Sequence, residues 1–212
     1  MSKVISLSGS GDSRIEVKQS VFIGRAVHVE TAEEANLFVK SERERYPDAR
    51  HTVYAWKISG DTNMQKYSDD GEPSGTAGMP VLSLLEHNDI TNAAVAVTRY
   101  FGGILLGKGG LVKAYTDCAK AALNDAVPAE FTDGELTRAT VSYSLSDKVL
   151  FELKKMQCEI TGSEYAEDVR FTFAASGEES ERIRDMLTDL TGGNVVFSKA
   201  GRKLIRGREL LL

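Results

Sequence analysis

The sequence predicts an α+β protein built from two domains. Segments with the period-two alternation of strands are interspersed with segments of helical periodicity along all 212 residues. Residues 127–137, VPAEFTDGELT, combine a proline with the turn pair Asp133–Gly134 and indicate a domain boundary. After that boundary the segments follow the order strand, helix, strand, strand, helix, strand. We therefore expect one domain over residues 1–133 and a second over residues 137–212.

The first half of the N-terminal domain alternates strand and helix patterns. Residues 14–29 alternate well enough for one or two strands. Thr31, with a glutamate three residues later, forms a capping box and predicts a helix that ends before Pro47. Residues 51–58, HTVYAWKI, are β-branched and aromatic and predict a strand. Residues 60–79 are polar and glycine-rich and predict a long loop.

Three further elements complete that domain. A short helix follows Pro80, which stands in its first turn, and runs through His87. The small apolar residues at the start of 93–100 predict a buried strand. A glycine-rich loop follows, and then a helix from Gly110 to about Ala126.

The C-terminal half carries four predicted strands and two predicted helices. The strands are expected at 138–145, 158–165, 168–175 and 194–198, and the helices at 147–157 and 178–190. This order is the ferredoxin-like pattern. Thr188, Gly192 and Gly193 fit the end of its second helix.

Composition narrows the function classes. A hydrophobic fraction of 42% is typical of a soluble globular chain. No apolar run approaches the ~20 residues of a membrane-spanning helix, and the N-terminus lacks the pattern of a signal peptide. The two cysteines, Cys118 and Cys158, are expected to be free thiols in a reduced cytoplasm. The net charge of −5 argues against a broad nucleic-acid-binding surface.

Positive charge is nevertheless concentrated near the C-terminus. Residues 199–208, KAGRKLIRGR, contain five cations and no acid. These cations are Lys199, Arg202, Lys203, Arg206 and Arg208. Two interpretations remain open: a tail that contacts phosphates, and a solvated C-terminal strand or frayed end.

A glycine-rich loop follows the predicted strand at 93–100. Residues 97–115 read VTRYFGGILLGKGGLVKAY, in which Gly102, Gly107 and Lys108 match most of a P-loop. The hydroxyl that would hold Mg²⁺ is missing, because Gly109 follows the lysine, so the pattern disfavours a nucleoside triphosphatase. The glycines then indicate a tight strand-to-helix turn, an anion cradle at a helix N-terminus, or both.

An acidic loop precedes it, with the sequence YSDDGEPSGTAGMP at 67–80. Its three carboxylates belong to Asp69, Asp70 and Glu72. One interpretation is a hard-cation site, since carboxylate oxygens suit Mg²⁺ or Ca²⁺. The favoured interpretation is structural: the acids pair with Arg99 and Lys108 and hold the two loops together.

Other chemistry is sparse. His51, at a strand start, is the only histidine we would test as an acid or base, and no nucleophile, base and metal constellation is present. We therefore assign no catalytic residue, cofactor or metal. Tyr54, Tyr100 and Phe101 could stack on nucleic-acid bases, but aromatics at strand positions are more typical of a core.

Three segments resemble a known family. ARHTVYAW (49–56), YSDDGEPSGTAGMPVL (67–82) and the segment 97–115 are similar in order and spacing to the signature blocks of the IMPACT / YigZ family. The resemblance implies an N-terminal α+β domain like the second domain of ribosomal protein S-five. The C-terminal half is similar to the ferredoxin-like module of the bacterial members, which resembles the last domain of elongation factor G.

The resemblance also marks positions. The signature residues are His51, Tyr54, Asp69, Asp70, Gly71, Glu72, Pro73, Ser74, Gly75, Gly78, Arg99, Tyr100, Phe101, Gly102, Gly103, Gly107, Gly109, Gly110 and Tyr115. A lysine at position 108 is not part of the signature, which removes the central residue of the P-loop interpretation.

The resemblance implies a regulator of translation. We expect a cytoplasmic, non-enzymatic protein that binds RNA or the ribosome, without contact to membranes and of undefined oligomeric state. The alternative is a hydrolase or metal-dependent enzyme. Its site would consist of His51, Asp69, Asp70, Glu72 and Arg99. A third possibility is a protein-interaction module that acts through the ferredoxin-like half.

Overall fold

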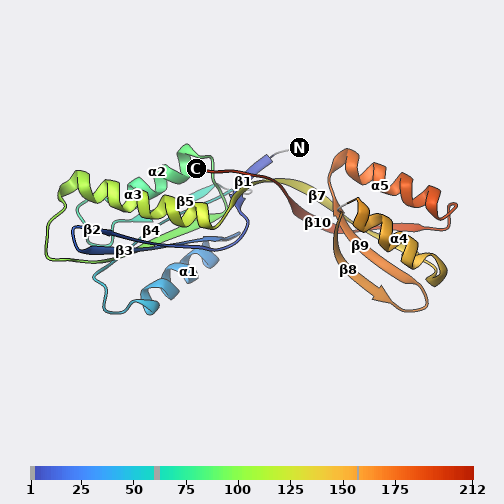
Figure 1. Cartoon of the computed structure of the whole chain (residues 1–212), viewed down its shortest axis with the longest axis horizontal. Helices are drawn as coiled ribbons and strands as arrows, with labels where there is room; N and C mark the ends of the chain where they lie inside the picture. The colour runs from blue at the N-terminus through green and yellow to red at the C-terminus, as the bar shows by residue number, and fades with distance from the viewer. Residues whose placement is uncertain (1–2, 60–62, 157) are drawn as a thin grey trace. The chain divides into compact units, whose positions relative to one another are not determined.

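The structure is a computed structural model that describes residues 3–59, 63–156 and 158–212. These residues form two compact units. The N-terminal unit comprises residues 4–130 together with 208–212, and the C-terminal unit comprises residues 131–207 together with Lys3. In Figure 1 the helices α1, α2 and α3 belong to the N-terminal unit, and α4 and α5 to the C-terminal unit.

The N-terminal unit is built on a five-stranded sheet in the order β2-β3-β6-β4-β5, with every neighbouring pair antiparallel. The strands are β2 (Gly11–Val17), β3 (Ser20–His28), β4 (His51–Ile58), β5 (Met64–Ser68) and β6 (Ala93–Tyr100). The central strand β6 matches the predicted range. It reads as a nearly continuous run of small apolar residues because both faces of the sheet are covered.

Helices lie on both faces of this sheet (Figure 1). Helix α1 (Ala32–Arg45) packs on one face, and α2 (Gly78–His87) with α3 (Gly107–Asp125) packs on the other. Helix α1 begins as predicted, because Thr31 Oγ1 accepts a hydrogen bond from Glu34 N at 3.1 Å.

The predicted long loop at 60–79 is wrong in one part. Residues 64–68 form strand β5, which pairs antiparallel with β4. This strand lies at the edge of the sheet and four of its five residues are exposed, so it lacks the apolar alternation that marks a half-buried strand. Residues 60–62 of the predicted loop lie outside the described residues.

The C-terminal unit has the predicted ferredoxin-like order. Its elements are β7 (Pro128–Val141), α4 (Tyr143–Lys155), β8 (Glu159–Tyr165), β9 (Val169–Ala175), α5 (Gly177–Leu190) and β10 (Val196–Glu209). The strands run in the order β10-β7-β9-β8, with α4 and α5 packed together over one face. Strand β1 (Lys3–Leu7) also pairs with β7. Helix α5 ends as expected, with Gly193 N donating to Thr188 O at 2.8 Å.

The segment predicted as a domain boundary, 127–137, contains the division between the two units, which falls after Glu130, but residues 128–137 belong to the long strand β7. Gly134 does not make a turn there. A Cβ at this position would lie 2.1 Å from Ile205 Cδ1, so the glycine allows β10 to approach closely. The turn signal in the sequence therefore has a packing cause.

The C-terminal residues also differ from the prediction. Strand β10 extends to Glu209, well beyond the predicted end at 198. Residues 208–212 belong to the N-terminal unit, where Leu210 N donates to Pro128 O at 2.7 Å and Leu212 N donates to Asn124 Oδ1 at 2.9 Å. Helix α4 begins at Tyr143, inside the strand predicted at 138–145, and residue 157 at the end of the predicted helix lies outside the described residues.

Candidate functional site

A buried network joins the acidic loop to the glycine-rich segment. Arg99 Nη1 donates to Glu72 Oε1 at 2.7 Å, and Tyr115 Oη donates to the same oxygen at 2.7 Å. The Arg99 and Glu72 side chains are only 7% and 4% exposed. Burial, and then the bond to Glu72, raises the pKa of Tyr115 far above its ordinary value. Three segments distant in the sequence are thus held at one point, and the predicted pairing of Glu72 with Arg99 is present.

Arg99 also lies between two aromatic rings. Its guanidinium carbon is 5.5 Å from the ring centroids of both Phe22 and Phe101. Nη2 donates to Ser20 Oγ at 3.4 Å, but the buried Nε has no hydrogen-bond partner. The strand register places Arg99 opposite Phe22 on β3 and opposite His51 on β4.

Asp69 caps helix α2 from outside the helix. Its Oδ1 accepts hydrogen bonds from Ala77 N at 3.0 Å and Gly78 N at 2.8 Å, and its Oδ2 accepts one from Gly75 N at 2.8 Å. The carboxylate therefore occupies the positive end of the helix. This role has no local sequence signal, because Asp69 stands eight or nine residues before the two helix N–H donors, whereas an ordinary N-cap stands two or three residues before them.

Asp70 fixes the start of strand β4. Its Oδ2 accepts from Thr52 N at 2.7 Å, and its Oδ1 accepts from Arg43 Nη2 at 2.5 Å. His51 Nδ1 lies 2.7 Å from Asp70 O. Since a carbonyl oxygen only accepts, Nδ1 donates its proton to Asp70 O. The acidic loop thus pairs with Arg43 and Arg99 and not, as also predicted, with Lys108.

The fold explains several glycines of the signature. A Cβ on Gly102 would lie 2.1 Å from Gln19 C, and Gly102 N donates to Ser20 Oγ at 3.2 Å. Gly103 and Gly107 have positive φ angles of 84° and 72°. The strand-to-helix turn of the sequence prediction therefore accounts for these three positions.

A cavity of about 420 Å³ adjoins this turn. Its wall is mostly apolar and includes Phe101 and Leu105, whereas Arg50 and Lys108 supply positive charge. His51 and the Glu72–Arg99 pair also line it. The N-terminus of α3 opens here with Leu106 at the N-cap, no side-chain cap and no acid in the first turn.

The remaining predicted site residues are dispersed. Tyr54 is buried in the core around α1, Tyr100 Oη donates to Asp48 Oδ1 at 2.8 Å, and Ser74 is exposed. Gly110 packs tightly on Leu106, since its Cβ would lie 3.1 Å from that side chain.

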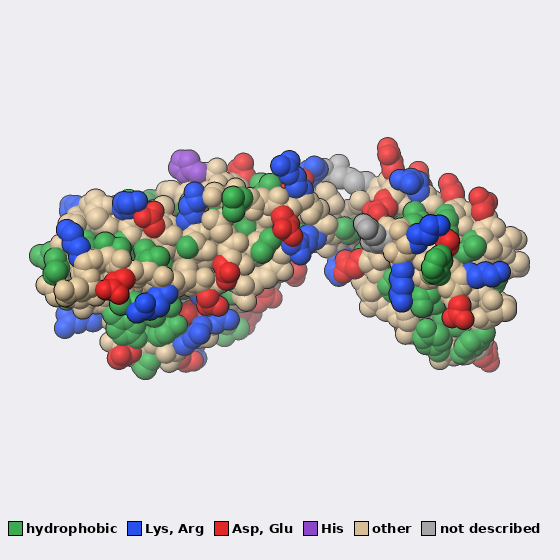
Figure 2. Space-filling view, in the orientation of Figure 1, with side chains coloured by type: hydrophobic (Ala, Val, Ile, Leu, Met, Phe, Trp, Pro, Cys, Tyr) green, Lys and Arg blue, Asp and Glu red, His purple; other side chains and the backbone are tan. Residues whose placement is uncertain are grey.

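The five cations predicted as a tail lie on or beside β10. Lys199 pairs with Glu135 at 3.9 Å and Lys203 pairs with Glu159. With Arg202, Lys199 lines a cavity of about 640 Å³ in the C-terminal unit that also contains acids. The frayed-end interpretation is wrong, and the solvated-strand interpretation describes this segment. On the face shown in Figure 2, cations and acids are interspersed over both units.

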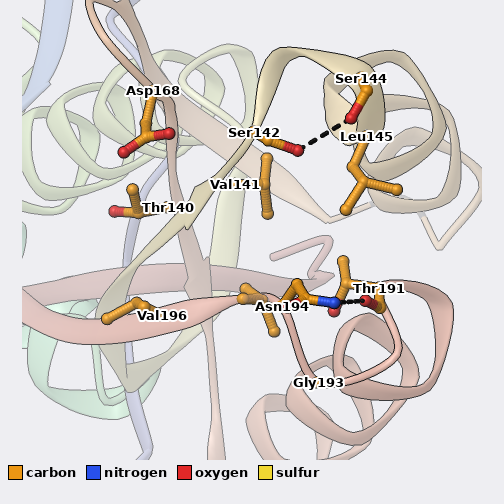
Figure 3. A pocket seen from close by; sticks show the side chains of 11 residues that line it. Thr140, Val141, Ser142, Ser144, Leu145, Asp168, Thr191, Gly193, Asn194 and Val196 are labelled. Carbon is orange, nitrogen blue, oxygen red and sulfur yellow. Dashed lines mark hydrogen bonds between the residues drawn. The ribbon is translucent and has the colours of Figure 1, made fainter.

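A further cavity of the C-terminal unit is uncharged except for Asp168 (Figure 3). It measures about 670 Å³ and lies at the N-terminus of α4. The dashed contacts in Figure 3 join Ser142 Oγ to Ser144 Oγ at 3.0 Å and Asn194 Nδ2 to Thr191 O at 3.0 Å. Its described lining residues include one acid, Asp168, and no Lys or Arg.

Metal coordination and membrane insertion are two further classes of site to consider. Within residues 3–59, 63–156 and 158–212, no three His, Cys, Asp or Glu side chains are grouped so that they could hold a metal ion. No helix in the same residues is long and apolar enough to cross a membrane.

Fold and site together define a class: a two-domain α+β protein whose first domain carries an Arg–Glu–Tyr network beside a glycine-rich helix N-terminus, and whose second domain is ferredoxin-like. The family model described as the Impact N-terminal domain matches residues 18–123. A domain of unknown function, DUF1949, matches residues 140–194.

Individual relatives agree. The chain is 36% identical over 184 residues to the IMPACT family member YigZ of Escherichia coli (strain K12), covering 85% of this chain and 89% of that protein. It is 33% identical over 184 residues to the IMPACT family member YvyE of Bacillus subtilis (strain 168), covering 87% and 85%. A crystal structure of a hypothetical protein matches with 32% identity and a TM-score of 0.60, over 93% of this chain and 97% of that one. The chain belongs to the IMPACT family, as the resemblance predicted.

Proposed function

We propose that this protein modulates translation in the cytoplasm by binding RNA or the ribosome, without catalysing a reaction. The observation that carries the proposal is the cavity at the N-terminus of α3, where Arg50 and Lys108 gather positive charge on a chain with a net charge of −5. Membership of the IMPACT family supports the connection to translation, which the sequence resemblance implied.

The charges around this cavity favour an anionic partner. Glu72 is neutralised by Arg99 in a buried pair, whereas Arg50 and Lys108 are exposed. The uncapped end of α3 adds about half a positive charge. Such a site makes few phosphate contacts, so binding is expected to depend on salt only moderately.

The C-terminal unit supplies the second surface of the proposal. Lys199 and Arg202 on β10 line the same cavity as Arg184 on α5. Glu135 forms ion pairs with both Arg184 and Lys199, which lowers the net charge there. We therefore assign the larger share of binding to the site at α3.

Co-sedimentation with ribosomes and separated subunits at low salt tests the proposal. The test variants are Arg50→Met and Lys108→Met, and the matched control is Lys113→Met, which removes an exposed lysine further along the same helix. We expect the test variants to pellet less than the wild type, and the control to pellet like it. Failure of the wild type to pellet, or equal pelleting of all variants, would overturn the proposal.

These surface variants are preferable to two larger changes. Arg99→Ala would leave Glu72 charged and buried without its partner. A truncation before Lys199 would remove most of β10 and the terminal residues that bond to the N-terminal unit. Either change would confound loss of binding with loss of structure.

No specific observation favours the enzyme alternative. The carboxylates of Asp69, Asp70 and Glu72 each accept hydrogen bonds from elsewhere in the fold. A thermal-shift screen with Mg²⁺, Mn²⁺ and Zn²⁺ is its direct test. A metal-specific rise in melting temperature that disappears in Asp70→Asn would favour it over the proposal.

A further inference from the structure

The cavity of about 640 Å³ in the C-terminal unit has both signs of charge in its wall. Its described lining residues include three cations and three acids, namely Arg184, Lys199, Arg202, Asp133, Glu135 and Glu181. A phosphate would therefore meet as many repelling as attracting charges here. The volume falls in the range of small-molecule sites, which is about 300–1,000 Å³. This balance favours a ligand that itself carries a positive and a negative group.

Only part of this charge is neutralised within the fold. Glu135 forms ion pairs with two of the three cations, at 3.3 Å and 3.9 Å. Asp133, Glu181 and Arg202 are exposed, and none of the three pairs with another described residue. These unpaired groups come from three elements, since Asp133 lies on β7, Glu181 on α5 and Arg202 on β10 (Figure 1). The wall of the cavity thus keeps charges of both signs available to a ligand.

Arg184 is fixed in the wall and still has donors to offer. Its Nη2 donates to Glu135 Oε1 at 3.3 Å and to Thr137 Oγ1 at 3.2 Å. Its guanidinium carbon lies 5.5 Å from the ring centroid of Phe197. The other two nitrogens, Nη1 and Nε, bond to no described residue. A guanidinium held in this way is prepared to donate to a carboxylate without losing further side-chain freedom.

Ser180 gives an independent indication of a ligand. The residue is 8% exposed and lines the cavity, yet no described residue bonds to its hydroxyl. Buried hydroxyls are normally hydrogen-bonded, so this one is left for a partner outside the fold. The hydroxyl of Ser8 is also without a described partner but is fully enclosed. The Ser180 oxygen, by contrast, keeps an opening, and it opens into the cavity that the residue lines.

The order of residues along α5 sets the spacing of the ligand's groups. Ser180 and Arg184 stand four residues apart and therefore on one face of the helix, where the hydroxyl and the guanidinium can share a carboxylate. Glu181, the neighbour of Ser180 in the chain, also lines the cavity and is free to pair with a cation. The negative and positive groups of the ligand must therefore lie close together, as they do on the α-carbon of an amino acid.

We propose that this cavity binds a free α-amino acid. The carboxylate of the ligand accepts hydrogen bonds from Ser180 Oγ and Arg184 Nη1. The ammonium group of the ligand donates to the carboxylates of Glu181 and Asp133. Because the zwitterion is neutral, it adds no net charge to a wall whose described charges already balance. This inference goes beyond the proposed function, and neither depends on the other.

Isothermal titration calorimetry of the full chain with each of the protein amino acids tests this site. For an amino acid that binds, the N-acetyl derivative removes the ammonium charge and the carboxamide removes the carboxylate charge. We expect at least one amino acid to bind, and to bind at least about tenfold more tightly than either of its derivatives. Inorganic phosphate is the probe for a simple anion site, and we expect it to bind more weakly than that amino acid.

Three variants separate binding from folding. Ser180→Ala removes a hydroxyl that bonds to no described residue, so it should weaken amino-acid binding about tenfold without lowering the melting temperature. Glu181→Gln removes an exposed, unpaired acid and should weaken binding about threefold. The matched control is Asp185→Asn, which removes an exposed acid of the same helix that is not among the described residues of the wall. It should bind like the wild type.

Three outcomes would overturn the site: no amino acid binds at millimolar concentration, an amino acid and one of its two derivatives bind equally, or Ser180→Ala binds like the control. If inorganic phosphate binds and no amino acid does, this inference fails and the cavity remains the second anion-binding surface of the proposed function. If an amino acid binds as expected but the chain does not pellet with ribosomes, the inference holds and the proposed function alone fails.

Discussion

The buried network makes a quantitative prediction for Tyr115→Phe. The change removes one hydroxyl that donates to Glu72 at 2.7 Å, and it leaves the ring packed edge-on against Phe22 at 5.1 Å between centroids. Hydrogen bonds to charged groups contribute about 1.5–3 kcal/mol. We therefore expect the free energy of unfolding of the N-terminal unit to fall by that amount. Glu72→Ala should cost about 3–5 kcal/mol, because it leaves Arg99 charged and buried.

Urea denaturation followed by tryptophan fluorescence measures this loss. The chain has one tryptophan, Trp56, which is 3% exposed in the core of the N-terminal unit and so reports the unfolding of that unit. The midpoint should shift with little change in slope. If the midpoint of Tyr115→Phe shifts from that of the wild type by an amount equivalent to less than about 0.5 kcal/mol, the network is not a source of stability.

The same variant carries a pH dependence. Tyr115 keeps its proton in the folded chain at a pH where the unfolded side chain ionises, near 10. The contribution of the Tyr115 hydroxyl to the free energy of unfolding is therefore complete below pH 10 and is lost as the pH rises above 10. The stability difference between wild type and Tyr115→Phe should shrink by about 1.4 kcal/mol by pH 11. A difference that stays constant to pH 11 would contradict the raised pKa.

Three other changes have defined outcomes. Asp69→Ala removes the cap of α2 and should lower the free energy of unfolding by about 1–2 kcal/mol. The control Ser74→Ala changes an exposed residue of the same loop and should change that free energy by less than about 0.5 kcal/mol. Equal effects of the two variants in urea denaturation would contradict the capping role. Gly102→Ala should lower the free energy of unfolding by about 1–3 kcal/mol, because the added Cβ would lie 2.1 Å from Gln19 C. A urea midpoint equal to that of the wild type would rule out this close contact. Burial raises the pKa of the Cys118 thiol to about 11. At pH 8, alkylation of this thiol by iodoacetamide, measured by mass spectrometry, should therefore be about 100-fold slower in the folded chain than in the urea-unfolded chain. Comparable rates would show that the thiol is accessible in the folded chain.

The sequence predicts the parts of the fold that depend on local pattern. Strand β6 was identifiable because a run of small apolar residues indicates a strand covered on both faces. Thr31 was identifiable as the N-cap of α1 because the capping signal spans only three residues. Strand β5 was missed because an exposed edge strand has no apolar alternation. The turn predicted at Gly134 was wrong, because a glycine that allows close packing cannot be told in sequence from a glycine in a turn.

The candidate site was predictable only in outline. The acidic and glycine-rich loops were expected to pair through Arg99, and Glu72 does so. The shared contact of Tyr115 with Glu72 spans 43 residues, and the capping of α2 by Asp69 has no local signature, so both depend on tertiary packing. Which glycines the packing requires could be judged only from the space around each Cβ.

The salt dependence of ribosome binding tests the central claim most directly. For the wild type, the logarithm of the association constant should fall linearly with the logarithm of salt concentration, with a slope that corresponds to about 3–5 phosphate contacts. Lys108→Met should reduce that slope by about one contact, and Lys113→Met should leave it unchanged. A flat salt dependence, or a Lys108→Met slope equal to that of the wild type, would contradict a phosphate-binding site at the N-terminus of α3.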